Sequence, residues 1–261
     1  DDIVYIEKAC IEYNKKIRCH IKVDTGMNRM GCKESDFNSI LDMCNKSLNI
    51  ILEGVYSHLS CADDINSLEN NKQINLFETI IKQSKKYRFK YHILNSAGIF
   101  NFTNSKFDLV RCGLSLYGIS PLNKINNNLL PVMELKAPVI LIKNIDKNET
   151  VGYGCSYKAD KSQKIAIVQC GYADGIPRNF GNRASVYYNQ YKFPIIGRVS
   201  MDLICIDISI LDDSDKLDEV TIWGGLQKDS RLELISRKFD TIPYVYLTNL
   251  SNRVKRVYVK E

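Results

Sequence analysis

Short apolar runs alternate with stretches of helical period through the first half of the chain. The predicted helices are Ile3–Ile17, a helix whose start Ser35 caps, and Leu68–Lys86. The predicted strands are His20–Val23, Ile50–Tyr56, Tyr91–Leu94 and Leu109–Leu116. Strands that alternate with helices are typical of a parallel sheet covered by helices.

Polar residues accompany each of these apolar runs: Asp24, His58, Asn95 with Ser96, and Arg111. In parallel α/β sheets, ligands bind at the carboxyl ends of the strands. We therefore expect the functional site of this half to lie in these loops.

A polar segment without periodicity, Asn123–Asn128, separates this half from one with a different pattern. Beyond it, strand follows strand: Val132–Ile142, Lys164–Gln169, Ser185–Tyr188, Leu203–Ile208 and Glu219–Trp223. One helix is predicted there, Leu232–Phe239. We expect an α/β domain over residues 1–128 and a mostly β domain over residues 129–261.

The first domain has few strands for its pattern. It offers about four strand-helix units, whereas a closed β/α barrel of the TIM type needs eight. A sheet left open in this way has unpaired edges. We expect a partial barrel, with a further segment in front of it.

Composition and charge exclude several classes of protein. The 261 residues are 44% hydrophobic and 25% charged, which suits a globular fold. The net charge of +6 is scattered rather than clustered, which argues against a nucleic-acid partner. The longest apolar runs have strand length, so no membrane segment is expected.

Cysteine and histidine spacing predicts no disulfide framework and no metal site. The nine cysteines form no C-x-x-C pair, and they suggest reduced thiols and a cytoplasmic location. The three histidines, His20, His58 and His92, lie far apart in the sequence without zinc-ligand spacing.

A series of short motifs points to a function. It begins with Lys22-Val-Asp-Thr-Gly-Met-Asn-Arg-Met-Gly31 and continues, in order, with Ser57-His-Leu-Ser-Cys-Ala-Asp63, Asn95-Ser-Ala97, Val110-Arg-Cys-Gly-Leu114, Gly152-Tyr-Gly154, Gly171-Tyr-Ala-Asp-Gly175, Gly197-Arg-Val-Ser-Met-Asp202 and Thr241-Ile-Pro-Tyr244. This ordered set resembles bacterial alanine racemase across nearly the whole chain. The departures are small: Asn28 replaces the usual glycine, and Ser200 stands where cysteine is common.

The resemblance implies a partial (β/α) barrel that binds pyridoxal phosphate (PLP), followed by a β domain, in a homodimer. The implied reaction interconverts L- and D-alanine through a PLP aldimine and two bases, and supplies D-alanine for peptidoglycan. The family carries its PLP lysine in a Lys-x-Asn-x-Tyr-Gly motif, which this chain lacks. We therefore expect the isolated chain to be inactive.

By resemblance, Tyr153 is one catalytic base and is supplied across the dimer interface. Arg29 touches that phenol and the substrate carboxylate, Lys22 corresponds to a lysine that is carbamylated in some members, and His58 lies beside the cofactor ring. Arg111 faces the pyridine nitrogen. The phosphate is held by Ser96, Gly113, Leu114 and Tyr244, and the substrate entrance is narrowed by Tyr172, Met201 and Asp202.

Each of these residues also has an ordinary structural interpretation. Tyr153 could be an aromatic at a turn, Arg29 a solvated surface side chain, His58 a core histidine, Ser96 a helix cap and Met201 a core filler. Two other functions fit the sequence: a racemase of serine or another small amino acid, and a non-catalytic PLP-binding or dimerisation protein.

Overall fold

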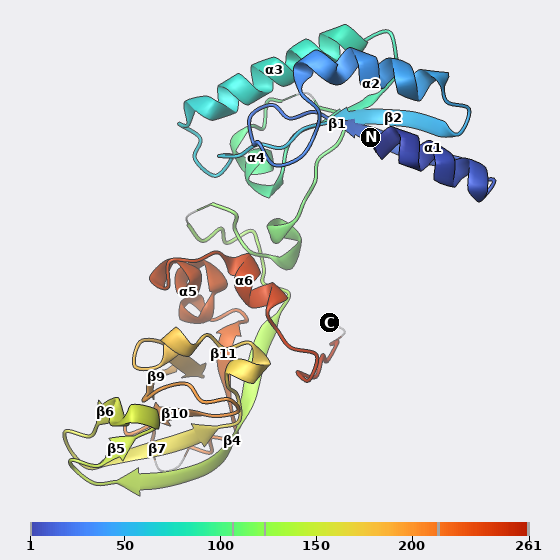
Figure 1. Cartoon of the computed structure of the whole chain (residues 1–261). Helices are drawn as coiled ribbons and strands as arrows, with labels where there is room; N and C mark the ends of the chain where they lie inside the picture. The colour runs from blue at the N-terminus through green and yellow to red at the C-terminus, as the bar shows by residue number, and fades with distance from the viewer. Residues whose placement is uncertain (1, 106, 123, 213–214, 260–261) are drawn as a thin grey trace. The chain divides into compact units, whose positions relative to one another are not determined.

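A computed structural model describes residues 2–105, 107–122, 124–212 and 215–259. The chain divides into two compact units (Figure 1). The first unit runs to Leu116 and includes Pro121 and Leu122, and the second comprises Tyr117–Ser120 and the chain from Lys124 onward. The division lies a few residues before the predicted boundary between residues 128 and 129, which we keep as a proposal.

The first unit contains a parallel sheet with strand order β1-β2-β3. Its strands are β1 (Ile17–Lys22), β2 (Ile50–Tyr56) and β3 (Lys90–His92). Its helices are α1 (Asp2–Glu12), α2 (Glu34–Lys46), α3 (Leu68–Ser84) and α4 (Ser96–Asn101). The predicted alternation of strands and helices is confirmed. No helix among the described residues is long and apolar enough to cross a membrane.

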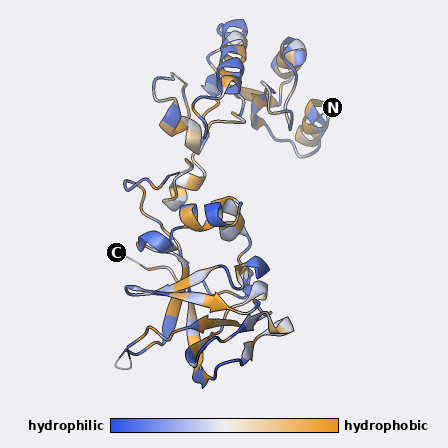
Figure 2. Ribbon diagram, turned by 90° about the vertical axis from the view of Figure 1, so that its left-hand side faces the viewer, coloured by the Kyte–Doolittle hydropathy of each residue, from blue (hydrophilic) through white to orange (hydrophobic). Residues whose placement is uncertain are grey.

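The core of this unit lies between the sheet and helices α2 and α3. Apolar side chains from one face of each helix pack against the strands, among them Phe37 and Leu41 from α2, Phe77 and Ile80 from α3, and Ile21 and Val55 from the sheet. The other faces of these helices are hydrophilic (Figure 2). The amphipathic spacing in the sequence therefore fixes which face of each helix is buried.

The prediction of a fourth strand over Leu109–Leu116 is wrong. Only one bridge forms there, between Asn95 and Arg111, and the Arg111 amide donates to the Leu94 carbonyl at 3.0 Å. The Gly113 amide then donates to the Ser96 hydroxyl instead of to a neighbouring strand. The chain continues in the 3-10 helix η1 (Leu114–Tyr117).

Two predicted helix ends also differ from the structure. Helix α1 stops at Glu12, because Asn14 adopts a left-handed φ of 49° and the chain re-enters the sheet at Ile17. Helix α2 is preceded by Lys33, whose side chain makes no capping hydrogen bond, and the Ser35 hydroxyl donates to Asp36. The prediction that Ser35 caps this helix is therefore wrong.

The second unit is built on a closed barrel in which β10, β7, β4, β11, β8 and β9 follow one another. The bounds are β4 (Glu134–Ile145), β7 (Gln163–Val168), β8 (Ser185–Tyr188), β9 (Tyr191–Ile196), β10 (Ile204–Asp207) and β11 (Glu219–Gly224). A short hairpin, β5 (Thr150–Val151) and β6 (Tyr157–Lys158), precedes β7. Helices α5 (Leu232–Lys238) and α6 (Pro243–Thr248) complete the unit. The sequence predicted all of these elements except β5, β6, β9 and α6.

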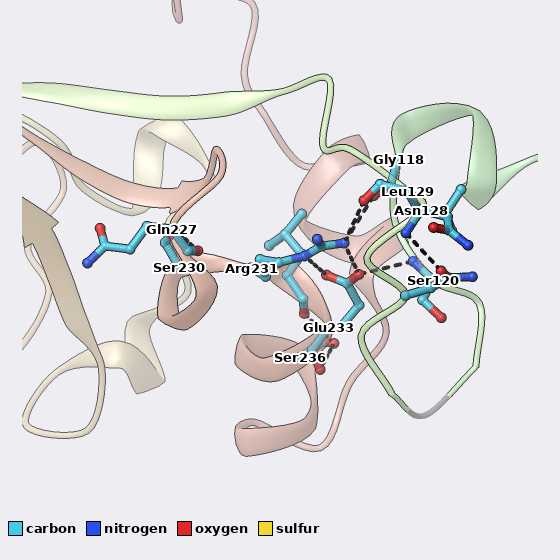
Figure 3. A network of polar contacts seen from close by, with 11 residues as sticks. Gly118, Ser120, Asn128, Leu129, Gln227, Ser230, Arg231, Glu233 and Ser236 are labelled. Carbon is cyan, nitrogen blue, oxygen red and sulfur yellow. Dashed lines mark hydrogen bonds and ion pairs between the residues drawn. The ribbon is translucent and has the colours of Figure 1, made fainter.

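A buried ion pair at the start of α5 forms hydrogen bonds with backbone groups of the segment that enters the second unit (Figure 3). Arg231 and Glu233 lie 2.6 Å apart with almost no exposed side-chain surface. Arg231 also donates to the carbonyls of Gly118 and Leu129, and Glu233 accepts from the Ser120 amide at 3.1 Å. These contacts hold the backbone of Gly118, Ser120 and Leu129 against the start of the helix.

Gly118 is required in this segment for two reasons. Its φ of +67° is left-handed, and a Cβ added there would lie 1.6 Å from the Leu130 carbonyl oxygen. Any other residue would therefore force the two backbones apart.

Candidate active site

The predicted site residues of the first unit follow the carboxyl ends of its strands. Lys22 is the last residue of β1, His58 follows β2 by two residues, and Ser96 begins α4 just after β3. Arg111 is joined to the same edge by its bridge with Asn95. The parallel order of the strands therefore brings these side chains to one edge of the sheet.

Arg111 is the centre of this group. Its Nη1 lies 2.6 Å from Nδ1 of His92, and its Nη2 lies 3.1 Å from Nδ1 of His58 and 2.6 Å from the Ser57 carbonyl oxygen. The guanidinium carbon sits 5.1 Å above the ring of Tyr56. Four residues from two strand ends thus fix the plane of the guanidinium.

The contacts of Arg111 determine the protonation of both histidines. A guanidinium can only donate, so Nδ1 of His58 and Nδ1 of His92 both act as acceptors and both rings are neutral. Burial, followed by the charge of Arg111, lowers the pKa of both rings, that of His92 to about 4. Arg111 therefore keeps its positive charge while its partners here are neutral.

Ser96 gathers hydrogen-bonding groups around its hydroxyl. The side chain is buried, and its oxygen lies 2.8 Å from the Gly113 amide nitrogen and 3.2 Å from the Ser115 hydroxyl. The helix N-cap is Asn95, whose side chain accepts from the Gly98 amide. The interpretation of Ser96 as a helix cap therefore fails, because its hydroxyl faces the Gly113 loop.

The loop after β1 is organised by Asp24. Its carboxylate accepts from the amides of Gly26 at 2.9 Å and Asn28 at 3.1 Å. Partial burial opposes ionisation, but the amide hydrogen bonds prevail and lower the pKa of Asp24. Asn28 has a φ of 55°, a conformation that glycine and asparagine adopt more readily than other residues. The departure at Asn28 therefore preserves the backbone that leads into Arg29.

Gln73 connects the loop after β1 to the loop after β2. This fully buried side chain donates to the Thr25 hydroxyl and to the His58 carbonyl, and accepts from the amide and hydroxyl of Ser60. One side chain on α3 thus ties together the loops that carry Arg29 and His58.

Lys22 lies in a cationic environment. Its burial and the charge of Arg29 lower its pKa, Arg111 acts in the same direction, and Asp24 opposes them. A lysine under these influences loses its proton more readily than one in water. The uncharged amine is the nucleophilic form of lysine.

Tyr153 lies in the second unit, on the turn between β5 and β6. Gly152 and Gly154 flank it with φ values of 74° and 69°. Arg198 covers the turn from behind, since a Cβ on Gly154 would lie 3.1 Å from its Nη1. The tyrosine side chain is 70% exposed. The turn therefore leaves the Tyr153 phenol exposed, while the backbone beside it packs closely against Arg198.

Tyr172 and Met201 lie on two segments that run alongside each other. The Tyr172 amide donates to the Ser200 carbonyl, and the Ala173 amide donates to the Met201 carbonyl, both at 3.0 Å. Met201 is 53% exposed, so its interpretation as a core filler fails. The segments are joined further by Arg253, which lies 2.7 Å from the carboxylates of both Asp174 and Asp202. Tyr244 is in the first turn of α6.

The structure therefore gathers the predicted residues into groups. The first unit holds Lys22, Arg29, His58, Ser96, Arg111, Gly113 and Leu114, and the second unit holds Tyr153, Tyr172, Met201, Asp202 and Tyr244. Sequence reasoning missed His92, Ser115 and Gln73. The sequence analysis considered His92 only as a metal ligand and gave it no role at the site, although it lies within the predicted strand Tyr91–Leu94 and is the last residue of β3.

The comparisons with known proteins agree on one family. Residues 1–121 match the family model described as "Alanine racemase, N-terminal domain". Residues 132–258 match the one described as "Alanine racemase, C-terminal domain". The alanine racemase of Coxiella burnetii is 35% identical over 100% of this chain and 72% of its own length. The chain belongs to the alanine racemase family.

Other alanine racemases show the same likeness. That of Vesicomyosocius okutanii is 42% identical over 91% of this chain, and the match covers 66% of the relative's own length. The crystal structure of the Bartonella henselae alanine racemase, "with covalently bound pyridoxal phosphate", is 34% identical. It matches 98% of this chain and 70% of its own with a TM-score of 0.86. The predicted fold, a partial (β/α) barrel followed by a mostly β domain, is confirmed.

Alanine racemases depend on PLP, and the residues of the first unit fit that cofactor. PLP carries an anionic phosphate and a pyridine nitrogen that accepts a hydrogen bond. The Gly113 amide and the Ser115 hydroxyl both donate to the Ser96 oxygen, so these groups lie together and the Ser96 hydroxyl keeps its own hydrogen to donate. Arg111 supplies a cationic donor whose partners described above are neutral. The donor set therefore matches the cofactor's two polar ends.

Proposed function

We propose that this chain supplies the main part of an alanine racemase active site that interconverts L- and D-alanine. The observation that supports this most directly is the cationic Arg111, held by neutral acceptors at the strand edge that also carries Ser96. The product, D-alanine, would serve peptidoglycan synthesis. We also propose a cytoplasmic location, because nine free cysteines suit a reducing compartment.

The cofactor would be held at both of its polar ends. PLP, when bound, withdraws electrons from the α-carbon of the amino acid and makes its proton removable. Ser96, the backbone of Gly113 and Leu114, and Tyr244 would hold the phosphate. Arg111, braced by His58, would donate to the pyridine nitrogen. Because arginine keeps its proton, that nitrogen stays unprotonated and the electron withdrawal is limited.

Tyr153 would move the α-proton on one face of the substrate. A phenol has an ordinary pKa of about 10, so a base at neutral pH needs a cation beside it. Arg29 would supply that cation and bind the substrate carboxylate with its planar donors. We propose that Tyr153 reaches this position from a second copy of the chain in a homodimer.

Three further residues would shape the substrate pocket around this phenol. Tyr172, Met201 and Asp202 would narrow the entrance from the same second copy, and so favour small amino acids. The exposure of Tyr172 and Met201 supports this placement, since neither is occupied in filling the core.

Lys22 would act on Arg29. We propose that its uncharged amine adds to carbon dioxide and releases a proton, which gives a carbamate anion able to hold the Arg29 guanidinium. The lowered pKa of Lys22 favours the amine form that this step requires. Intact-mass measurement tests the modification directly, and an unmodified Lys22 in a fully active protein would reject it.

The second base would be the lysine of the Lys-x-Asn-x-Tyr-Gly motif, which these 261 residues do not contain. We therefore compare the chain alone with a fusion in which the segment of a family member that bears this motif precedes Asp1. Racemisation of L-alanine is followed by circular dichroism, with PLP binding as a check on folding. We expect activity in the fusion and none in the chain alone.

Two controls assign the reaction. Tyr153→Phe in the fusion should abolish most racemisation of alanine while PLP still binds. Parallel assays with L-serine identify the preferred substrate. A fusion that binds PLP but racemises neither amino acid would overturn the proposed function, and activity of the chain alone would overturn the role given to the lysine.

A further inference from the structure

His20 is a histidine on β1 that the proposed reaction does not use. Its Nδ1 lies 2.9 Å from Nε2 of His92, and the two rings meet edge-on with centroids 5.0 Å apart. His92 is in turn the closest ring partner of Arg111. Three side chains from three different segments therefore form one chain of hydrogen bonds, from Arg111 through His92 to His20.

The direction of every hydrogen bond in this chain follows from Arg111. A guanidinium only donates, so Nδ1 of His92 accepts and carries no proton. A neutral imidazole has one N–H, which places the proton of His92 on Nε2. Nε2 therefore donates to Nδ1 of His20, and the proton of His20 is on its own Nε2. The contact with Arg111 and the contact with His20 therefore require the same tautomer of His92, with its proton on Nε2.

The sheet makes room for His20 at a defined place. The register of β1 and β2 shifts between Cys19 and His20, which brings His20 opposite Gly54. A Cβ on Gly54 would lie 2.4 Å from Nδ1 of His20 and 2.5 Å from its Cε1. The His20 ring therefore occupies the space that a side chain at position 54 would take.

The position of the His92 ring is fixed independently of His20. Its ring stacks on Tyr56 with centroids 5.1 Å apart and planes within 8° of parallel, and it is buried. Stacking does not distinguish the two neutral tautomers, because it depends on the ring and not on which nitrogen holds the proton. In the wrong tautomer, two N–H groups would face each other at the 2.6 Å separation between His92 and Arg111.

We propose that His20 is a positioning residue that acts on Arg111 through His92. By accepting the proton of His92 Nε2, it stabilises, together with Arg111, the tautomer of His92 whose Nδ1 accepts from Arg111 and holds the guanidinium in place for the cofactor. The first half of this proposal concerns the chain alone, and the second half rests on the proposed function. A buried acceptor matters here because an unsatisfied N–H in this position would be costly.

The tautomers can be measured without cofactor or substrate. Long-range proton–nitrogen correlation spectra of the ¹⁵N-labelled chain show which imidazole nitrogen carries hydrogen. The chain has three histidines, so single variants assign every signal. We expect both His20 and His92 to be protonated on Nε2. A wild-type His92 protonated on Nδ1 would overturn the proposal, whatever the activity of the protein.

Two variants separate positioning from packing. His20→Phe keeps an aromatic ring against Gly54 but removes the acceptor, whereas His20→Asn is smaller but retains an acceptor oxygen near the place of Nδ1. We expect the Phe variant to lose the single Nε2-H tautomer of His92 and to bind PLP about tenfold more weakly, the loss expected when one hydrogen bond is removed. The Asn variant should retain the tautomer and most of the affinity.

Each result has a definite meaning. If His92 keeps its tautomer in His20→Phe, or if both variants lose affinity equally, His20 only packs against the sheet and the proposal is wrong. If His20→Phe fails to fold, the spectrum of the wild-type chain and the PLP affinity of His20→Asn still test the proposal. If the chain passes the tautomer test but the fusion binds PLP without racemising alanine or serine, the proposed function alone is refuted.

Discussion

Arg231 and Glu233 form an ion pair with a separation of 2.6 Å in the interior of the second unit, where both side chains are almost fully buried. The pair also binds backbone groups of the segment that enters the unit, at Gly118, Ser120 and Leu129. Removing one partner would leave a buried charge without its counter-ion, which costs much more than the pair itself contributes.

We expect Glu233→Ala to lower the free energy of unfolding by about 3–5 kcal/mol. Urea denaturation followed by tryptophan fluorescence measures this, since Trp223 is buried in the same unit. The matched control is Asp229→Ala, which breaks an exposed pair with Lys192 and should cost about 0–1 kcal/mol. Equal losses in the two variants would show that the buried pair has no special role.

Stability should fall in mild acid because of His92. Burial, and then the charge of Arg111, lowers the pKa of His92 to about 4 from 6.5. Between these pH values the unfolded chain binds a proton that the folded chain does not, so the free energy of unfolding rises with pH. The contribution is complete above pH 6.5 and decreases by about 3 kcal/mol as the pH falls to 4.

The comparison with His92→Gln isolates this effect from other groups that titrate in the same range. His58, whose pKa is also lowered, contributes with the same sign and is present in both proteins. The variant should show a shallower pH dependence in urea denaturation between pH 4 and 6.5. Identical slopes in the two proteins would mean that His92 is not held neutral.

Ser96→Ala should weaken PLP binding by about tenfold or more, the loss expected when a hydrogen bond to a charged group is removed. Fluorescence titration of the chain with PLP measures this change. Ser35→Ala is the control, because that exposed hydroxyl bonds only to Asp36 among its contacts described above. An unchanged affinity in Ser96→Ala would place the phosphate elsewhere.

Cysteine reactivity should differ strongly along the chain. Burial raises the pKa of Cys170 to about 12, whereas Cys112 and Cys155 are exposed. At pH 8, Cys170 should contain about a thousandfold less thiolate than a thiol of pKa 9.0. In alkylation with iodoacetamide followed by peptide mass spectrometry, Cys112 and Cys155 should be labelled before Cys170. Denaturation in urea should abolish this difference in labelling rate. Early labelling of Cys170 in the folded chain would contradict the structure.

The sequence predicted the fold where periodicity is strong. Ile50–Tyr56 matches β2 at both ends, and the strands of the barrel other than β9 were placed within a few residues. It failed where tertiary contacts override local pattern. Leu109–Leu116 is apolar enough for a strand, yet its Gly113 amide bonds to Ser96. Helix α6 was missed although Pro243 at its first position is a helix-start signal.

The site residues were predicted from the motifs, so residues of the site that lie between the motifs were not predicted. Gln73 belongs to an amphipathic helix, and its sequence gives no sign that it joins two loops. His20 and His92 are separated by 72 positions, so only the pairing of the strands brings them together. The spacing of residues in the sequence does not show which side chains the parallel order of the strands brings into contact.

The fit between Gly54 and His20 sets a limit on how this protein can be improved. Glycine weakens a strand interior by roughly 0.5–1 kcal/mol relative to alanine, so a programme of thermostability engineering would select position 54 for replacement. Any larger residue there would displace the His20 ring, since even a Cβ would lie 2.4 Å from it. On the role proposed for His20, a stiffer strand at this position would come at the expense of the contact that orients His92.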